Sequence, residues 1–221
     1  MGELARSTQK CMLPFEGKPL LQHSLEEATK ALGRFNPILA VSYRAKDVVD
    51  YFGRFWGHDE IMYVYDEGGV EDRGVVQGVK EYLQGGPFLV VHGNILFNGA
   101  LFVEAIQMQE AYTPLATISL AKKVNESKHA VVRLENRKVT DMVFPAPDVI
   151  PDGYLRDMGL NAYDSSVYGL IERFAHDPRI YMMGLLERAL GEDDEVAGIQ
   201  YYGDWLHFER PIDFRREREQ K

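Results

Sequence analysis

FLVV, at residues 88–91, is the most apolar strand-like run in the first half of the chain. Two similar short runs precede it, PILAV at residues 37–41 and IMYVY at residues 61–65. Between them, residues 46–55 and 75–83 place apolar side chains at helical spacing. Strands that alternate with helices in this way are typical of βαβ units. The first half of the chain is therefore predicted to be α/β with a parallel sheet.

Outward from this region, a helix is predicted over residues 19–32, with Gly33 as its stop signal. A second helix is expected at residues 100–112 and a third at 180–189. After Asn98 the pattern changes to short strands joined by tight turns. These strands are expected at residues 115–122, 129–134, 138–144, 165–170 and 199–202. Glu135-Asn136-Arg137 is a plausible hairpin connection, whereas Asp66 to Gly74 is expected to be a loop.

Composition limits the kind of protein further. With 221 residues, 45% of them apolar, the chain is long enough for one large α/β domain, so a single domain over residues 1–221 is expected. A formal net charge of -9 argues against nucleic acid as a partner. No apolar run reaches transmembrane length and no signal peptide is evident, so neither a membrane partner nor secretion is expected.

A single cysteine, Cys11, excludes an intrachain disulfide and suits a reducing compartment, which favours a cytoplasmic location. Its neighbours Lys10 and Met12 make a reactive thiol conceivable. A small packed side chain is the preferred interpretation.

The segment from Lys10 to Leu20 carries the first family resemblance. Lys10, Leu13-Pro14 and Gly17-Lys18-Pro19-Leu20 resemble the residues that sugar-1-phosphate nucleotidyltransferases place just after their Gly-rich phosphate loop. Met1 aligns where that loop ends. The resemblance therefore implies an N-terminally truncated chain in which the first strand and the Gly-rich loop are missing. Alternatively, the start is an artefact and the true protein has the loop. If the chain is truncated, the middle strand of the sheet is expected to be missing between the strands at 37–41 and 88–91, so that either something fills this gap or the two strands pair directly.

Four further segments resemble family motifs in the right order. Residues 41–53 (VSYRAKDVVDYFG) resemble V-x-Y-x-x-x-x-V-x-x-Y-F, and residues 87–97 (PFLVVHGNILF) resemble P-F-L-V-V-N-G-D-x-L-F. Residues 165–170 resemble the strand N-A-G-I-Y-x-F, and residues 203–214 resemble G-Y-W-x-D-I-G-T-P-x-D-Y. The resemblance implies a three-layer α/β sandwich with a mixed, mostly parallel central sheet, and residues 115–120 as one of its strands.

The family joins a nucleoside triphosphate to a sugar 1-phosphate and releases pyrophosphate. Two aspartates of the family hold a magnesium ion that bridges the phosphates. Here Asn94 and His207 stand at those two positions, and neither is a carboxylate. Glu209, two residues beyond His207, would share its strand face and could compensate in part; Asp204 would point to the other face. The implied metal site is thus a degenerate set of Asn94, His207 and Glu209.

Other recognition positions are partly kept. The L-G-T-A-G-A loop of the family corresponds to residues 73–78 (RGVVQG), where only Gly74 is retained, and Gly93 matches the glycine of V-N-G-D. Asp164 falls at the asparagine of N-A-G, although Asn161-Ala162 is a competing alignment. Lys10 either grips a phosphate as a catalytic residue or is an exposed lysine at the end of a loop. Gly74, Gly93 and Asp164 are the implied substrate-binding residues.

Two functional hypotheses follow from the resemblance. In the first, the chain transfers a nucleotide to a sugar 1-phosphate with impaired activity and uses magnesium. In the second, it is a catalytically silent homologue without a cofactor that binds a sugar nucleotide or a protein partner as a regulatory subunit. The expected partners are a nucleoside triphosphate or nucleotide sugar and a sugar phosphate, with a homo-oligomer or a partner subunit possible.

Overall fold

The structure is a computed structural model that describes residues 8–65, 71–83, 85–122, 129–177, 180–192 and 194–208. It divides into two compact units, each built from separate stretches of the chain. Unit 1 comprises Met1–Glu67, His92–Phe102 and Gly203–Lys221, and unit 2 comprises Gly68–Val91 and Val103–Tyr202. That the whole chain forms one domain stays a prediction.

Unit 1 contains short strands and two helices that begin within the first third of the chain. In chain order its elements are η1 (Lys10–Met12), β1 (Pro14–Phe15), β2 (Lys18–Pro19), α2 (Leu20–Leu32), β3 (Ile38–Val41), α3 (Ala45–Phe52), β4 (Phe55–Trp56), β5 (Asp59–Glu60), β6 (Met62–Tyr65), β8 (Ile95–Leu96) and β14 (Leu206–His207). Helix α5 (Ala100–Tyr112) begins in this unit and continues into unit 2.

Both helices of unit 1 end at a glycine with a positive φ angle. Gly33 has φ 72° and donates its N–H to Thr29 O at 2.9 Å, and Gly53 has φ 65° and donates to Val49 O at 2.9 Å. A residue without a side chain takes this conformation at little cost, which is why glycine ends helices. The predicted helix over residues 19–32 and its stop at Gly33 are confirmed.

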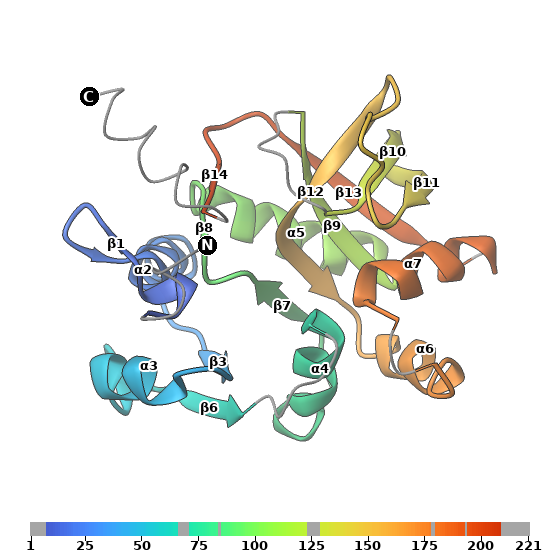
Figure 1. Ribbon diagram of the computed structural model, residues 1–221. Coiled ribbons are helices and arrows are strands. Elements are labelled where there is room, and N and C mark those ends of the chain that lie inside the picture. Colours follow the sequence, from blue (N-terminus) through green and yellow to red (C-terminus); the bar gives the residue numbers. More distant parts are fainter. Residues whose placement is uncertain are drawn as a thin grey trace. The chain divides into compact units, whose positions relative to one another are not determined.

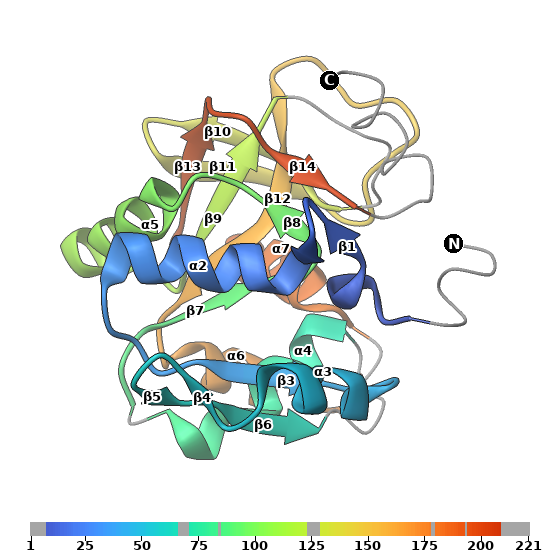
Figure 2. The same cartoon turned by 90° about the vertical axis from the view of Figure 1, so that its left-hand side faces the viewer.

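The parallel pairing expected in the first half is present between β3 and β6 (Figure 2). Ile38 lies opposite Met62 and Val41 lies opposite Tyr65. A compact apolar cluster packs here, formed by Leu25, Leu39, Val41, Val48, Phe52 and Ile61. A second cluster joins the ends of the unit through Leu13, Leu20 and Phe208. Burial of these side chains anchors β8 and β14 against the N-terminal hairpin.

Unit 2 is a mixed sheet with helices. Its elements are α4 (Glu71–Gly78), η2 (Lys80–Tyr82), β7 (Phe88–Val91), β9 (Ala116–Ala121), β10 (Val131–Glu135), β11 (Lys138–Val143), β12 (Tyr154–Tyr163), α6 (Val167–Arg173), α7 (Met182–Gly191) and β13 (Val196–Tyr201). The strand order is β10-β11-β13-β9-β12-β7, and α7 packs on β11 (Figure 1). The chain is thus α/β with a mixed sheet, as predicted.

The expectation of a mostly parallel sheet is wrong for this six-stranded sheet. Only β9 and β13 pair in parallel, whereas β12 runs antiparallel to β7, β9 and β10. Short connections such as the β10–β11 hairpin force antiparallel neighbours, because parallel strands need a long crossover. In that hairpin Asn136 and Arg137 both have positive φ, 49° and 68°, as a two-residue type I′ turn requires.

The pairings in this sheet form a closed cycle, because β10 pairs with β12 as well as with β11. The cycle runs β9–β12–β10–β11–β13 and returns to β9. β11 meets β13 through one register pair, Lys138 with Ala197. β12 contains a bulge between Asp157 and Asn161, where Gly159 has φ 84°. Such a bulge bends a strand and allows a small barrel-like closure.

Two element predictions fail. Residues 165–170 are not a strand, because Val167–Arg173 forms α6 and the long buried strand is β12, immediately before it. The segment 66–74 is not entirely a loop, because α4 already begins at Glu71. In the first case V-Y-G-L is apolar enough for either structure, and its side chains are buried by helix packing.

The expected gap between the strands at residues 37–41 and 88–91 stays a prediction. The missing first strand stays a prediction, since residues 1–7 lie outside the described part. The three-layer arrangement also stays a prediction. None of the helices in the described residues is long and apolar enough to cross a membrane.

Candidate functional site

Asn94 and His207 are brought together by a short antiparallel ladder in unit 1. β8 pairs with β14, with Ile95 opposite His207 and Leu96 opposite Leu206. The backbone N–H of Phe208 donates to Asn94 O at 3.0 Å, which continues the ladder by one residue. The Ser24 hydroxyl of α2 donates to Ile95 O at 3.1 Å and ties the ladder to that helix. The two positions that the sequence alignment pairs are therefore neighbours.

The amide group of Asn94 is oriented by two acceptors. Its Nδ2 donates to Phe208 O at 3.1 Å and lies 3.1 Å from His207 Nε2. A carbonyl oxygen only accepts, so the Phe208 contact fixes the NH₂ group on this side of Asn94. His207 Nε2 must then accept the second hydrogen, which places the ring hydrogen on Nδ1. This is a neutral hydrogen-bonded pair.

His207 is held in place on several sides. The residue is 5% exposed, and the Trp205 ring lies nearly parallel to the imidazole, with 6.2 Å between centroids and 14° between planes. The next residue, Phe208, is 1% exposed and packs with Leu13 and Leu20. Displacing His207 would therefore disturb a packed cluster as well as the hydrogen bond.

These residues do not fit the magnesium ion that the resemblance implies. Magnesium prefers carboxylate and phosphate oxygens in octahedral geometry. Asn94 turns two N–H hydrogens toward this space, and the lone pair of His207 Nε2 is already used. Within the described residues no group of three or more His, Cys, Asp or Glu could hold a metal ion. Glu209, the third expected ligand, lies outside the described residues, and Asp204 is exposed.

Gly93 is enclosed by the segment that carries Lys10. A Cβ atom at Gly93 would lie 2.9 Å from Cys11 Cβ and 3.6 Å from Leu21 Cδ1. Glycine here permits the Gly93 backbone to approach the Cys11 side chain closely, which is a packing role in addition to the implied substrate-binding role. Burial raises the pKa of the Cys11 thiol from 9.0 to about 11, so this thiol is not a reactive nucleophile. The packed-side-chain interpretation is supported.

Lys10, the implied catalytic residue, begins η1 and is exposed. This position agrees with either role, so both stay open. Gly74 and Asp164 belong to unit 2, whereas Lys10, Gly93, Asn94 and His207 belong to unit 1. The substrate-binding roles of Gly74, Gly93 and Asp164 stay predictions.

Asp164 forms the turn that precedes α6. Its Oδ1 accepts the N–H of Ser166 at 2.8 Å, and hydrogen bonds from Ser166 lower the pKa of this carboxyl. β12 ends at Tyr163, so Asp164 follows this strand directly, whereas the competing match Asn161-Ala162 lies within it.

Asp157 is buried in the bulge of β12, at 2% exposed. Its Oδ1 accepts the Gly159 N–H at 3.0 Å, and its Oδ2 lies 3.3 Å from His129 Nδ1. A buried carboxylate needs such partners to offset the loss of solvation. This pair could not be anticipated from the sequence, because the two residues are far apart in the chain.

Arg73, beside Gly74, is a buried cation that sequence reasoning also missed. It is 5% exposed, and its guanidinium donates to backbone carbonyls only: Asp177 at 2.7 Å, Phe174 at 3.3 Å, Ile180 at 3.4 Å and Ile171 at 3.5 Å. These carbonyls lie at the end of α6 and in the segment before α7. Arg73 therefore ties α4 to the α6–α7 connection.

Comparison with known proteins supports the resemblance. No protein-family model matches the chain. A bifunctional protein GlmU of Methanocaldococcus jannaschii is 27% identical over 216 residues, which is 95% of this chain and 48% of that protein. A mannose-1-phosphate guanylyltransferase catalytic subunit beta of Drosophila pseudoobscura pseudoobscura is 24% identical over 220 residues, 96% of this chain and 56% of that protein. The chain spans about half the length of the curated relatives it matches.

Solved structures share the fold. A UDP-glucose pyrophosphorylase complexed with UDP-glucose superposes with a TM-score of 0.79 at 16% identity, and the match covers 100% of this chain and 94% of that one. The fold is that of the sugar-1-phosphate nucleotidyltransferases. The chain's similarities in sequence and in fold thus both lie with GlmU and the nucleotide-sugar pyrophosphorylases, as its motifs predicted.

Proposed function

We propose that this protein is a nucleotidyltransferase-type protein that takes a nucleoside triphosphate and a sugar 1-phosphate, with transfer strongly impaired. Support for the substrate class comes from the ordered motifs, from the relatives and from the fold. Support for a cytoplasmic location comes from the lone cysteine, which suits a reducing compartment. Fold alone does not establish an activity, so the residues of the site must carry the argument.

The observation that carries the proposal is the hydrogen bond between Asn94 and His207. Transfer of a nucleotidyl group depends on positioning and on neutralising phosphate charge rather than on an activated side chain. Two neutral side chains, hydrogen-bonded to each other, stand where the sequence resemblance aligns the family's two aspartates. The loss of one electrostatic contact in an active site commonly lowers the rate by about 10²–10³, and here two charged ligands are replaced.

The second hypothesis is a silent homologue that binds a sugar nucleotide, or a protein partner, as a regulatory subunit. The same hydrogen bond favours it, because a neutral bonded pair gives the fold local stability without a cation. Gly93 also packs closely against Cys11, and this structural role of the glycine does not depend on catalysis.

The test is a panel of nucleoside triphosphates, each paired with glucose 1-phosphate or mannose 1-phosphate, assayed for pyrophosphate release in magnesium. We expect release to be undetectable or very slow. A thermal-shift assay run in parallel detects binding, and a shift without turnover favours the silent homologue. The double variant Asn94→Asp, His207→Asp should recover little, because a cation acts only on a triphosphate that other parts of the site hold in position. Robust turnover by the unaltered protein would contradict the proposal.

A further inference from the structure

The hydrogen bonds around Asn94 turn its NH₂ group, rather than its oxygen, toward His207. Its NH₂ group donates to Phe208 O and to His207 Nε2, both at 3.1 Å. If the amide turned over, its oxygen would face the Phe208 carbonyl oxygen, and that hydrogen bond would be lost. The imidazole would then donate to the turned oxygen from Nε2, so in neither orientation does His207 Nε2 offer a cation a lone pair toward Asn94.

The backbone around this pair resists rearrangement. Phe208 N–H donates to Asn94 O at 3.0 Å, so Asn94 and Phe208 exchange hydrogen bonds through both main chain and side chain. Leu206 lies opposite Leu96 in the same ladder. To form a cation site, both side chains would have to leave their present positions. The register of β8 with β14, which the apolar cluster around Phe208 stabilises, opposes this change.

The electrostatic consequence concerns the ligand. Two carboxylates at these positions would add two negative charges that a bound divalent cation would offset. Asn94 and His207 are neutral without any ion. A nucleoside triphosphate ends in a phosphate whose second ionisation lies near pH 6, whereas both phosphates of a nucleotide sugar are diesters with a single charge each.

We infer that this site binds without a divalent cation and takes a nucleotide sugar in preference to a nucleoside triphosphate. The inference rests on the proposed function, since it names the ligand of the same site. It goes further in replacing the metal-bridged triphosphate by a less charged ligand held through neutral contacts.

The first measurement is titration calorimetry on the unaltered protein with UDP-glucose, GDP-mannose, UTP and GTP. Each ligand is titrated in excess EDTA and again in excess magnesium. The nucleotide sugar should bind with the same Kd in both buffers. In EDTA it should bind about tenfold or more tightly than the matching triphosphate, because the additional phosphate charge of the triphosphate then has no cation to offset it. Binding of the nucleotide sugar that requires magnesium would overturn the inference, as would preferential triphosphate binding in EDTA.

The second measurement needs no nucleotide. Manganese binding is followed by electron paramagnetic resonance in the unaltered protein, in His207→Gln, whose side-chain oxygen can still accept from Asn94, and in Asn94→Asp, His207→Asp. We expect equal weak binding in the first two and a gain of about tenfold or more in the double variant, whose carboxylates suit a hard cation. Tight manganese binding by the unaltered protein that His207→Gln weakens would overturn the inference.

The two measurements separate the two proposals. If no nucleotide or nucleotide sugar binds in either buffer, the proposed function is wrong, while the manganese titration still decides whether the site excludes a cation. If the double variant does not fold, as judged by its melting curve, the comparison between the unaltered protein and His207→Gln gives the same decision.

Discussion

At the scale of single residues, the amide of Asn94 shows how one neutral side chain alters the chemistry expected of this fold. A carboxylate at this position could only accept hydrogen bonds, whereas Asn94 donates two, one to a backbone carbonyl and one to an imidazole. The pair therefore holds together without an ion. Asn94 and His207 are far apart in the sequence, and the antiparallel pairing of β8 with β14 brings them together.

Replacing Asn94 by aspartate should lower stability when no cation is present. Asn94→Asp removes both donors and sets a carboxylate against Phe208 O, so we expect a loss of about 1–3 kcal/mol in the free energy of unfolding. Asn98→Asp is the matched control, because Asn98 Oδ1 accepts the N–H of Ala100 and a carboxylate at the start of α5 still can. Urea denaturation in EDTA measures both. Equal stability of the two variants would contradict the assignment of the Asn94 amide.

At the scale of secondary-structure elements, most of unit 2 is joined by contacts that local sequence does not encode. The hairpin β10–β11 was predictable, because its turn and its alternating strands are local. β12 was not, because Arg156, Asp157 and Asn161 lie within a strand that is buried along most of its length, and a polar side chain normally argues against burial. For the same reason, the sequence pattern predicts a strand at residues 165–170, where the structure has helix α6.

The link from α4 to the α6–α7 connection depends on Arg73. Lysine has no fork of donors to reach several carbonyls, so Arg73→Lys should leave buried acceptors unsatisfied and cost at least about 1–3 kcal/mol. Arg173→Lys is the control, since Arg173 is an exposed residue that pairs with Glu192 and Asp194 and should change stability by no more than about 0.5 kcal/mol. Thermal or urea unfolding followed by circular dichroism distinguishes them. A small effect at Arg73 would show that its carbonyl contacts are dispensable.

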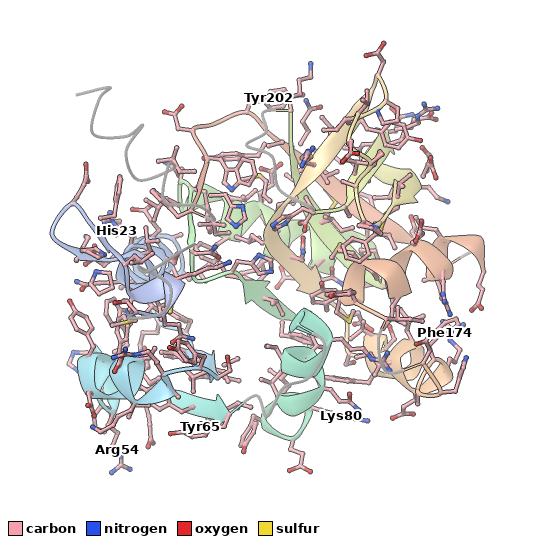
Figure 3. All side chains as sticks on the ribbon, viewed as in Figure 1. His23, Arg54, Tyr65, Lys80, Phe174 and Tyr202 are labelled. Carbon is pink, nitrogen blue, oxygen red and sulfur yellow. The ribbon has the colours of Figure 1, made fainter. Side chains whose placement is uncertain are left out.

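At the scale of the whole molecule, how stability depends on pH follows from how its carboxylates are paired. The pKa of Glu172 is lowered, first by its hydrogen bond from Lys80, which lies on η2 (Figure 3). The pKa of Glu187 is raised instead, first by burial and then by the charge of Asp141. A lowered folded-state pKa contributes stability above the unfolded pKa that is lost as pH falls. A raised one contributes stability at low pH that is lost as pH rises.

The same substitution should therefore have opposite effects at these two positions. Glu187→Gln is expected to stabilise the protein at neutral pH, with the difference vanishing in acid, where the carboxyl is protonated in both states. Glu172→Gln should destabilise it slightly at neutral pH, because an exposed pair contributes little, and should have no effect in acid. Unfolding curves across this pH range measure both. Two differences of the same sign at neutral pH would contradict these pKa directions.

The sequence also predicts several features of the molecule as a whole. The α/β class, the β3–β6 pair and the proximity of Asn94 to His207 follow from local periodicity and motif order. The antiparallel majority in the six-stranded sheet does not, because the partner of a strand is set by tertiary packing and β12 alone pairs with three others. The Asp157–His129 pair and the contacts of Arg73 were hidden for the same reason: each joins residues far apart in sequence.

The pairing of β8 with β14 has a consequence for how the protein is made. Chains emerge from the ribosome from the N-terminus at about 5–20 residues per second, so β8 is synthesised well before its partner strand. Asn94 cannot meet His207, and the cluster of Leu13 and Leu20 cannot close, until Phe208 has emerged. During synthesis, apolar surface near Lys10 and Gly93 therefore stays exposed until Phe208 has been made. A chain that stalls before Phe208 would present that surface to chaperones.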